Sequence, residues 1–279
     1  VFDLKRTRPA GRPLANTSDG LPRLRGPRGR LPGQPVVHMR ADPEALSRAA
    51  AAFLIQTLRR KPDALVCLAS GASPARTYQG LAAHGRRHPG LFARVRWLQL
   101  DEWGGLADDD PATCRAWLRR ELLEPLGVPT GRFFSWSSQP ANPAAECQRV
   151  AAWLARHGPI DVAVLGVGTN GHLGLNEPAR ALQPGPHVAR LSATARTHTM
   201  LRMARCPPRY GLTLGMANLL QARQIVLLVS GGHKARVLRR FFSRRVTASL
   251  PVSFLWLHPA VTIFCDTAAT ALLRPGWLA

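Results

Sequence analysis

The chain has 279 residues, 46% of them hydrophobic, so it is long enough and apolar enough to bury a sizeable core. No apolar run approaches the roughly 18–20 residues of a membrane span, and the basic, Pro-rich start (VFDLKRTRPAGRPL) lacks the apolar region of a secretory signal. These features argue against a membrane protein or a secreted one, and we expect a globular protein of the cytoplasm.

The formal net charge of +22 raises the question of nucleic-acid binding. Only three of the basic residues are lysines (Lys5, Lys61 and Lys234), and the arginines are spread along the chain without a patch in which basic and aromatic residues alternate. We interpret the excess as a bias in composition and expect no nucleic-acid partner. The five cysteines are scattered, without CxxC or Cys/His clusters at metal spacing, so we expect reduced thiols and no metal site.

The first part of the chain differs in composition from the rest. Residues 1–35 carry eight Lys/Arg and two Asp among many Pro and Gly, without periodicity. This composition is typical of disorder. We therefore expect residues 1–35 to be a disordered basic tail and residues 36–279 to form the folded domain.

The regular pattern begins with a helix over Pro43–Arg60, for which Asp42 is a suitable N-cap. A buried strand over Ala64–Ser70 then runs into the turn Gly71–Pro74 and a helix over 75–84. Such a turn offers backbone N–H groups and the positive end of the helix dipole to an anion. Neither GxGxxG nor GxxxxGK[ST] is present, which leaves a phosphate on a small metabolite rather than a dinucleotide or a nucleoside triphosphate.

The next strand, Val95–Leu100, ends directly before Asp101 and Glu102. Two carboxylates at the carboxyl end of a parallel strand lie where catalytic groups usually lie, although either one alone is more often a helix cap or a surface acid. The acidic run Asp108–Asp110 is expected to be a solvated loop.

The stretch over 162–177 (VAVLGVGTNGHLGLNE) starts as an apolar run and breaks into glycines before Asn170, His172 and Glu177. An apolar run that ends in Gly-x-Gly is typical of a buried parallel strand reaching the edge of a sheet, where open α/β sheets bind ligands. His172 and Glu177 could form an imidazole–carboxylate pair there, or could merely make hydrogen bonds within the loop. The spacing alone does not decide between the two.

The segment Ile225–Phe242 repeats the design of strand, glycine turn and helix, with Lys234 in the first helical turn. A lysine at that end opposes the helix dipole, and a bound anion would remove the conflict. The alternation of strands and helices predicts one α/β domain. The other expected elements are helices over 114–123, 144–157, 196–201 and 214–220 and strands over 160–166, 253–257 and 261–266.

Three motifs, each after an expected strand, resemble the glucosamine-6-phosphate deaminase/isomerase family: SGASP (70–74), LDEW (100–103) and GTNGHLGLNEP (168–178). GHLGLNEP and the late segment SFLWLH (253–258) are more similar to the galactosamine-6-phosphate deaminase/isomerase branch. The resemblance covers roughly Val36–Thr267. It implies a single α/β domain with a Rossmann-like, mostly parallel sheet and helices on both faces, and neither a metal nor an organic cofactor.

The same resemblance implies a reaction, in which a 2-amino-2-deoxy-aldohexose 6-phosphate becomes the ketohexose 6-phosphate and ammonia. Asp101 would be the base that moves a proton between C2 and C1, and His172, oriented by Glu177, would open the sugar ring. A carboxylate can reach both carbons, and a histidine beside a carboxylate titrates near neutrality, so these residue types suit the chemistry. The residues implied to hold the phosphate are Ser70, Gly71, Ala72, Ser73 and Lys234.

The chain also departs from the family pattern. Asn170 stands where the best-studied members have Asp, and an Asn cannot supply the second charge of a three-residue relay, which leaves the pair of His172 and Glu177. The phosphate-binding Arg of those members falls near Leu201, and Arg202 is the nearest replacement. Basic residues of their allosteric site have no clear match around 183–189, so we expect no activation by an N-acetylated sugar phosphate.

These observations favour an aminosugar-phosphate deaminase, with galactosamine 6-phosphate as the expected substrate and glucosamine 6-phosphate as the alternative. A 6-phosphogluconolactonase shares the fold and a related Gly-His loop, but its loop lacks Asn-Glu-Pro and lactone hydrolysis needs no base at C1 and C2. A non-catalytic sugar-phosphate-binding regulator is a third alternative, and a DNA-binding protein ranks last. Relatives range from monomers to hexamers, so a homo-oligomer remains open.

Overall fold

The computed structural model describes residues 33–274 of the chain. The disordered tail expected over residues 1–35 therefore lies almost wholly outside the described residues. Within residues 33–274, no helix is long and apolar enough to cross a membrane.

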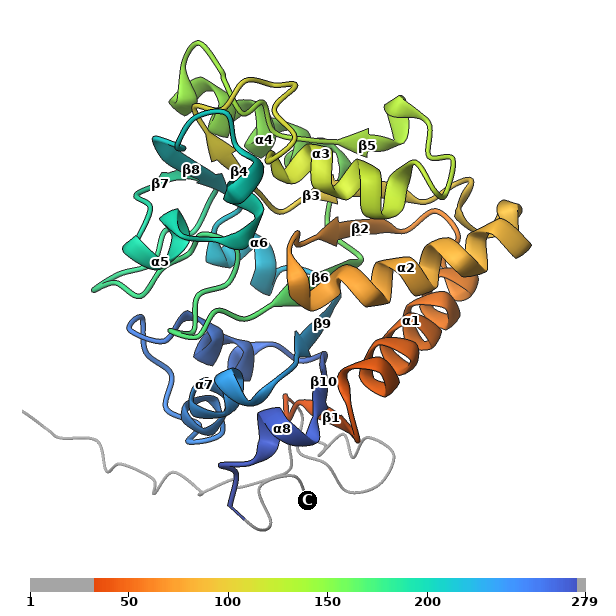
Figure 1. Ribbon diagram of the computed structural model, residues 1–279, viewed down its shortest axis with the longest axis vertical. Coiled ribbons are helices and arrows are strands. Elements are labelled where there is room, and N and C mark those ends of the chain that lie inside the picture. The colour runs from red at the N-terminus through yellow and green to blue at the C-terminus, as the bar shows by residue number, and fades with distance from the viewer. Residues whose placement is uncertain (1–32, 275–279) are drawn as a thin grey trace, which may run out of the picture. The chain divides into compact units, whose positions relative to one another are not determined.

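A seven-stranded sheet, in which all neighbouring strands run parallel, forms the centre of the fold (Figure 1). Its order is β1-β10-β9-β6-β2-β3-β5. The chain passes from β2 outward to β3 and later returns to the other side of β2 as β6, so the order reverses between β2 and β6, where open α/β sheets bind ligands. The strands are β1 (Val36–Arg40), β2 (Leu65–Leu68), β3 (Arg96–Gln99), β5 (Phe133–Phe134), β6 (Val162–Gly166), β9 (Gln224–Val229) and β10 (Val261–Asp266).

The central strands are buried on both faces, as β6 shows. Its residues Val162 and Val164 belong to one core cluster, whereas Ala163 and Leu165 belong to the other, because successive side chains of a strand point to opposite faces. Residues of α1 and α2 fill the first cluster, and residues of α4, α6 and α7 fill the second. The expected fold class, a Rossmann-like, mostly parallel sheet with helices on both faces in one domain, is confirmed.

The helices follow the sequence pattern closely. The first begins and ends where it was expected, and its N-cap Asp42 accepts a hydrogen bond from the backbone N–H of Ala45 (2.7 Å). The α-helices are α1 (Pro43–Arg60), α2 (Ala72–Arg87), α3 (Cys114–Leu118), α4 (Pro143–His157), α5 (Ala193–Arg196), α6 (Met216–Leu220), α7 (Ala235–Phe241) and α8 (Thr267–Thr270). The 3-10 helices are η1 (Pro89–Phe92), η3 (Thr130–Arg132), η4 (Thr199–Met203), η5 (Gly232–Lys234) and η6 (Pro251–Leu257), and the π-helix η2 (Arg119–Leu123) continues α3.

A second, antiparallel sheet was not expected. It has the order β4-β8-β7 and consists of β4 (Asp101–Gly104), β8 (Tyr210–Thr213) and β7 (His187–Ala189). The strand β4 follows β3 after the single residue Leu100, so the chain passes directly from one sheet to the other. Asp101, the first residue of β4, pairs with Thr213 and therefore stands at the junction of the two sheets.

Two expected elements differ from the structure, the first in kind and the second in extent. The segment over 253–257 is part of the 3-10 helix η6 and not a strand, because Pro251 opens the segment and its fixed φ suits a helical turn. A short apolar run does not by itself distinguish a strand from a buried helical turn. The single helix expected over 196–201 is divided between the end of α5 and η4.

Candidate active site

A cavity of about 370 Å³ lies at the carboxyl edge of the parallel sheet. Its walls come from the segments that follow four adjacent strands, β2, β3, β6 and β9, and from the polar segment Thr197–Thr199. Larger hollows of about 580 and 570 Å³ lie between α1 and α2 and beside β7. We place the site in the smaller cavity because the predicted acid, base and anion-binding groups meet there.

The turn after β2 forms one wall of this cavity. Gly71 is the N-cap of α2 and has φ +105°, a backbone conformation that favours glycine, and it offers no side-chain cap to the helix. The first N–H groups of α2 thus have no intrahelical partner and are available to an anion. Lys234, at the start of α7, lines the same cavity, and burial lowers the pKa of its ammonium group. The structure therefore brings the predicted phosphate-binding turn and Lys234 together.

Asp101 enters the cavity from the junction between the two sheets. Burial, with a further contribution from the neighbouring charge of Glu102, raises the pKa of Asp101 from its ordinary value of 3.8 to about 7. A carboxyl group with a pKa near 7 is poised to accept and return a proton at neutral pH.

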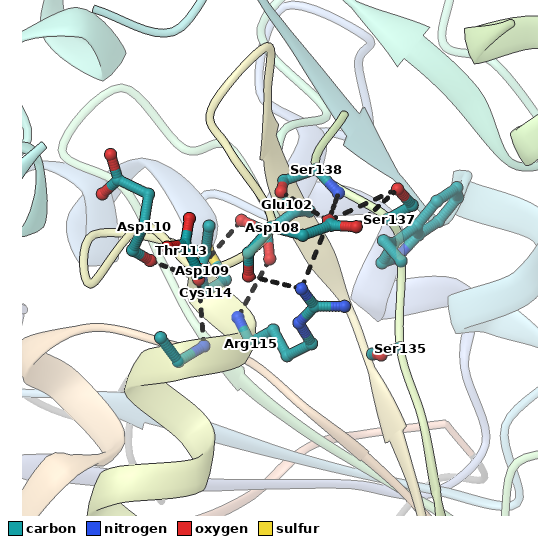
Figure 2. Close-up of polar contacts among 12 residues, drawn as sticks. Glu102, Asp108, Asp109, Asp110, Thr113, Cys114, Arg115, Ser135, Ser137 and Ser138 are labelled. Atoms are coloured by element: carbon teal, nitrogen blue, oxygen red, sulfur yellow. Dashed lines mark hydrogen bonds and ion pairs between the residues drawn. The ribbon is translucent and has the colours of Figure 1, made fainter. Parts of the chain in front are cut away.

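Glu102 points away from the cavity and is fully buried. Its Oε1 accepts hydrogen bonds from the backbone N–H groups of Trp103 (2.7 Å) and Cys114 (2.8 Å), and its Oε2 accepts from the N–H of Arg115 (2.9 Å) and from Nε2 of Gln99 (2.8 Å). Figure 2 shows this carboxylate at the beginning of α3, beside the Asp108–Asp110 loop. Glu102 thus ties β4 to α3 immediately next to Asp101.

The Asp108–Asp110 loop is only partly the solvated run that we expected. Asp109 is exposed and pairs with Arg205 (2.9 Å). Asp110 is fully buried. Its carboxylate accepts hydrogen bonds from the backbone N–H groups of Ala112 and Arg205 (both 2.9 Å), and it thereby joins two loops that lie far apart in the sequence.

His172 and Glu177 face each other in the loop after β6. Nδ1 of His172 lies 3.5 Å from Oε1 of Glu177, longer than a normal hydrogen bond but within ion-pair distance. Glu177 is oriented by two further donors, Nδ2 of Asn170 (2.7 Å) and Oγ of Ser192 (2.9 Å). Burial alone would raise the pKa of Glu177, but its contacts with His172, Asn170 and Ser192 lower it, so Glu177 carries the negative charge of the pair.

Asn170 has a definite role in this loop. Its Oδ1 accepts from the backbone N–H of His172 (3.1 Å), which assigns the other end of the amide as the donor to Glu177. An unprotonated aspartate could not donate that hydrogen bond. Gly168 is required for a different reason, since a Cβ there would stand 2.3–2.5 Å from the ring atoms of His172.

The structure does not bring Arg202 to the cavity. Arg202 is exposed and belongs to η4, whose buried residue is Met200, and Arg202 does not line the cavity. Sequence reasoning instead missed several lining residues, among them Trp103, His198 and His233. Trp103 and His233 are neighbours of predicted residues, but nothing in the local pattern around His198 signals a site.

Within residues 33–274, no group of three or more His, Cys, Asp or Glu side chains is placed to hold a metal ion. The groups that the cavity does offer are N–H donors, an ammonium group, imidazoles and a carboxyl group with a raised pKa. Such a set can bind an anion and move protons.

A parallel α/β sheet with an anion-binding turn, a buried carboxyl group and a histidine–carboxylate pair at its carboxyl edge defines a Rossmann-like protein with an acid–base site. The family model described as glucosamine-6-phosphate isomerases/6-phosphogluconolactonase matches residues 41–263. The chain belongs to this family.

The relatives agree with this assignment. AgaI of Escherichia coli (strain K12), provisionally named a deaminase, is 41% identical over 77% of this chain and 85% of its own. The glucosamine-6-phosphate deaminases of Geobacillus sp. (strain WCH70) and Streptomyces coelicolor (strain ATCC BAA-471 / A3(2) / M145) are 32% and 36% identical over 84% of this chain and 94% and 90% of theirs.

Solved structures give the same fold. A monomeric glucosamine-6-phosphate deaminase has a TM-score of 0.81 at 30% identity, covering 85% of this chain and 99% of that one. The 6-phosphogluconolactonase from Trypanosoma brucei has a TM-score of 0.69 at 21% identity over 86% of this chain and 99% of that one, a likeness that shows the fold alone.

Proposed function

We propose that this chain converts a 2-amino-2-deoxy-aldohexose 6-phosphate, with galactosamine 6-phosphate as the preferred substrate, into the ketohexose 6-phosphate and ammonia. One observation carries the proposal. Asp101, with a pKa of about 7, and His172, faced by Glu177, line the same cavity as the turn at the start of α2 and Lys234.

The reaction begins with opening of the sugar ring. In our proposal His172 gives a proton to the ring oxygen as the C1–O5 bond breaks, and it takes up the proton that the C1 hydroxyl releases as the aldehyde forms. Glu177 lies 3.5 Å from Nδ1 of His172 and so orients the ring for this transfer.

Proton transfer between the two carbons follows. Asp101 removes the C2 proton as His172 gives a proton to the C1 oxygen, which produces an enolamine. Asp101 then returns its proton to C1, and the nitrogen lone pair forms the iminium at C2, which gives its extra proton back to His172 as it becomes the imine. Water then adds to this imine, ammonia departs, and the C2 ketone of the product remains. The balance is one aminosugar phosphate and one water consumed for one ketose phosphate and one ammonia formed.

Binding of the phosphate makes the transfer efficient. The N–H groups of α2 and the ammonium group of Lys234 would hold the 6-phosphate and so fix C1 and C2 relative to Asp101. Such positioning can lower a barrier by several kcal/mol.

The choice of the galacto epimer rests on similarity. The chain is more similar to AgaI, at 41% identity, than to the two glucosamine-6-phosphate deaminases named above, at 32% and 36%. The segments GHLGLNEP and SFLWLH point to the same branch. Glucosamine 6-phosphate is the alternative substrate, and the cavity geometry does not favour a lactonase, which has no use for a base at C1 and C2.

Ammonia release tests the proposal. The purified chain is incubated with galactosamine 6-phosphate, glucosamine 6-phosphate and 6-phosphogluconolactone in parallel, with Asp101→Asn as the inactive control. We expect ammonia from the two aminosugar phosphates, faster from the galacto epimer, and no hydrolysis of the lactone above background. Lactone hydrolysis without ammonia release would replace the deaminase with the lactonase.

A further inference from the structure

His198 occupies the side of the cavity that faces the anion-binding turn. The Cε1–Nε2 edge of its ring lies 3.6 Å from the point where a Cβ on Gly71 would stand. Gly71 is the N-cap of α2, so this edge is directed at the place where the helix offers its free N–H groups. On its other side, the ring contacts Trp103 at 5.7 Å between ring centroids.

The backbone fixes which ring nitrogen of His198 carries the proton. Nδ1 accepts a hydrogen bond from the backbone N–H of Met200 (3.3 Å). In a neutral imidazole with an acceptor at Nδ1, the proton is on Nε2, which is the nitrogen near Gly71. His198 therefore presents a donor to the cavity.

The neighbouring charges keep this ring neutral. Burial lowers the pKa of His198, and the nearby positive groups of His172 and Lys234 lower it further. A charged imidazole at this position would lose solvation and be repelled by Lys234, whereas a neutral N–H donor avoids both costs.

We propose that His198 is a substrate-binding residue whose Nε2–H donates a hydrogen bond to the phosphate, opposite Lys234 and above the first turn of α2. This inference rests on the proposed function only in taking the ligand to be a phosphate monoester. His198 then supplies a donor in the part of the chain where the sequence predicted Arg202 to supply one.

Two substitutions distinguish a His198 that donates a hydrogen bond to phosphate from a His198 that only packs in the structure. His198→Ala removes the donor, whereas His198→Gln keeps an N–H group at a similar reach. Arg196→Ala, an exposed arginine in the same segment, controls for the general loss of positive charge. Melting curves of all four proteins establish that each is folded.

The first measurement is the binding of inorganic phosphate by calorimetry, which does not depend on turnover. We expect His198→Ala to raise the Kd at least about tenfold, as for a lost hydrogen bond to a charged group, and His198→Gln to restore most of the affinity. Arg196→Ala should leave the Kd within about twofold of the original value, as for an exposed charge.

The second measurement is the kinetics with galactosamine 6-phosphate. We expect His198→Ala to raise KM by a larger factor than it lowers kcat, because the N–H groups of α2 and Lys234 still hold the phosphate and position the substrate. An unchanged Kd for phosphate, a glutamine variant as weak as the alanine variant, or a fall in kcat at constant KM would overturn the proposal. Phosphate binding that depends on His198 in a chain that releases no ammonia would uphold this inference and refute the proposed reaction.

Discussion

The carboxyl group of Asp101 acquires the pKa that a base needs from its position in the chain. It begins β4 at the junction of two sheets, where burial and the adjacent Glu102 both disfavour its charge. Water would solvate the same group on a surface loop and hold its pKa near 3.8. The dipeptide Asp-Glu after a strand therefore marks a candidate site, but it does not predict the raised pKa of Asp101.

Asp101→Asn should reduce kcat by a factor of about 10² to 10⁴, because removal of a general base usually costs that much. Binding of inorganic phosphate should be unchanged. In the unsubstituted protein kcat/KM should fall as the pH drops below about 7, since protonated Asp101 cannot accept the C2 proton. Measurements of kcat/KM from pH 5.5 to pH 8 cover both sides of that pKa. A kcat/KM that does not change over this range would show that Asp101 is not the base.

Asp101 also makes the stability of the fold depend on pH. Stability should fall as the pH rises, whereas activity should increase. The pKa of Asp101 in the native chain, about 7, exceeds its ordinary value of 3.8, so the native state binds the proton more tightly than the unfolded state. The stability that this protonation contributes is full below about pH 4 and is lost as the pH rises through 7. Asp101→Asn should thus raise Tm at pH 8 and change it little at pH 4. Equal changes in Tm at pH 4 and pH 8 would contradict a raised pKa for Asp101.

Gly168 is the residue on which the orientation of His172 depends. Gly168→Ala places a methyl group within 2.5 Å of the imidazole, so the ring must leave its position opposite Glu177. We expect kcat to fall at least about tenfold while the chain remains folded, because misplacement of a catalytic group by about 1 Å can cost a hundredfold. Gly131→Ala is the matched control, since nothing lies within 4 Å of its Cβ position. Equal activity of the two variants would show that the ring is not constrained.

The residues of the site differ in how well the sequence predicts them. Ser70, Asp101, His172 and Lys234 each follow a strand with a clear apolar run, and the edge of a parallel sheet gathers such residues. His198 follows no strand of that sheet. It reaches the cavity because the chain returns from the second sheet, a path that no local pattern specifies.

At the scale of the elements, Glu102 connects the second sheet to α3. Four N–H donors surround its buried carboxylate, three of them on the backbone. These hydrogen bonds offset part of the cost of burying the charge, which still leaves the pKa of Glu102 raised. The position of Asp101 therefore depends on a network that extends to α3 (Figure 2).

Glu102→Ala should lower the free energy of unfolding by about 3 kcal/mol or more, because it leaves several buried N–H groups unpaired. Urea unfolding measures the loss. Glu124→Ala removes an exposed carboxylate that pairs with Arg119 at 3.4 Å, and it should cost less than about 1 kcal/mol. Comparable losses for the two variants would mean that the network around Glu102 contributes nothing to stability.

The elements also show where sequence patterns fail. Long amphipathic helices and fully apolar strands were predicted with bounds close to those of the structure, as α1 shows. The short strands β4, β7 and β8 were not, because three or four residues carry too little periodicity and their pairing is set by distant partners. The buried Asp110 was missed for the same reason, since its partner Arg205 lies far along the chain.

At the scale of the whole molecule, the order of the strands builds the site. Four adjacent strands, β9, β6, β2 and β3, end at one edge, and each is followed by one part of the proposed site: Lys234, the His172 loop, the turn at Gly71 and Asp101. The basic residues that give the net charge of +22 are spread along the sequence and are not concentrated in one segment. A positive surface would nevertheless attract phosphorylated substrates.

The most direct test of the central claim is the balance of products in a single sample of galactosamine 6-phosphate, followed by NMR. The proposed reaction predicts one ammonium and one ketohexose 6-phosphate for each substrate consumed, and no conversion with Asp101→Asn. Substrate that remains unchanged while the chain binds it would contradict the reaction and leave a sugar-phosphate-binding protein on the same fold.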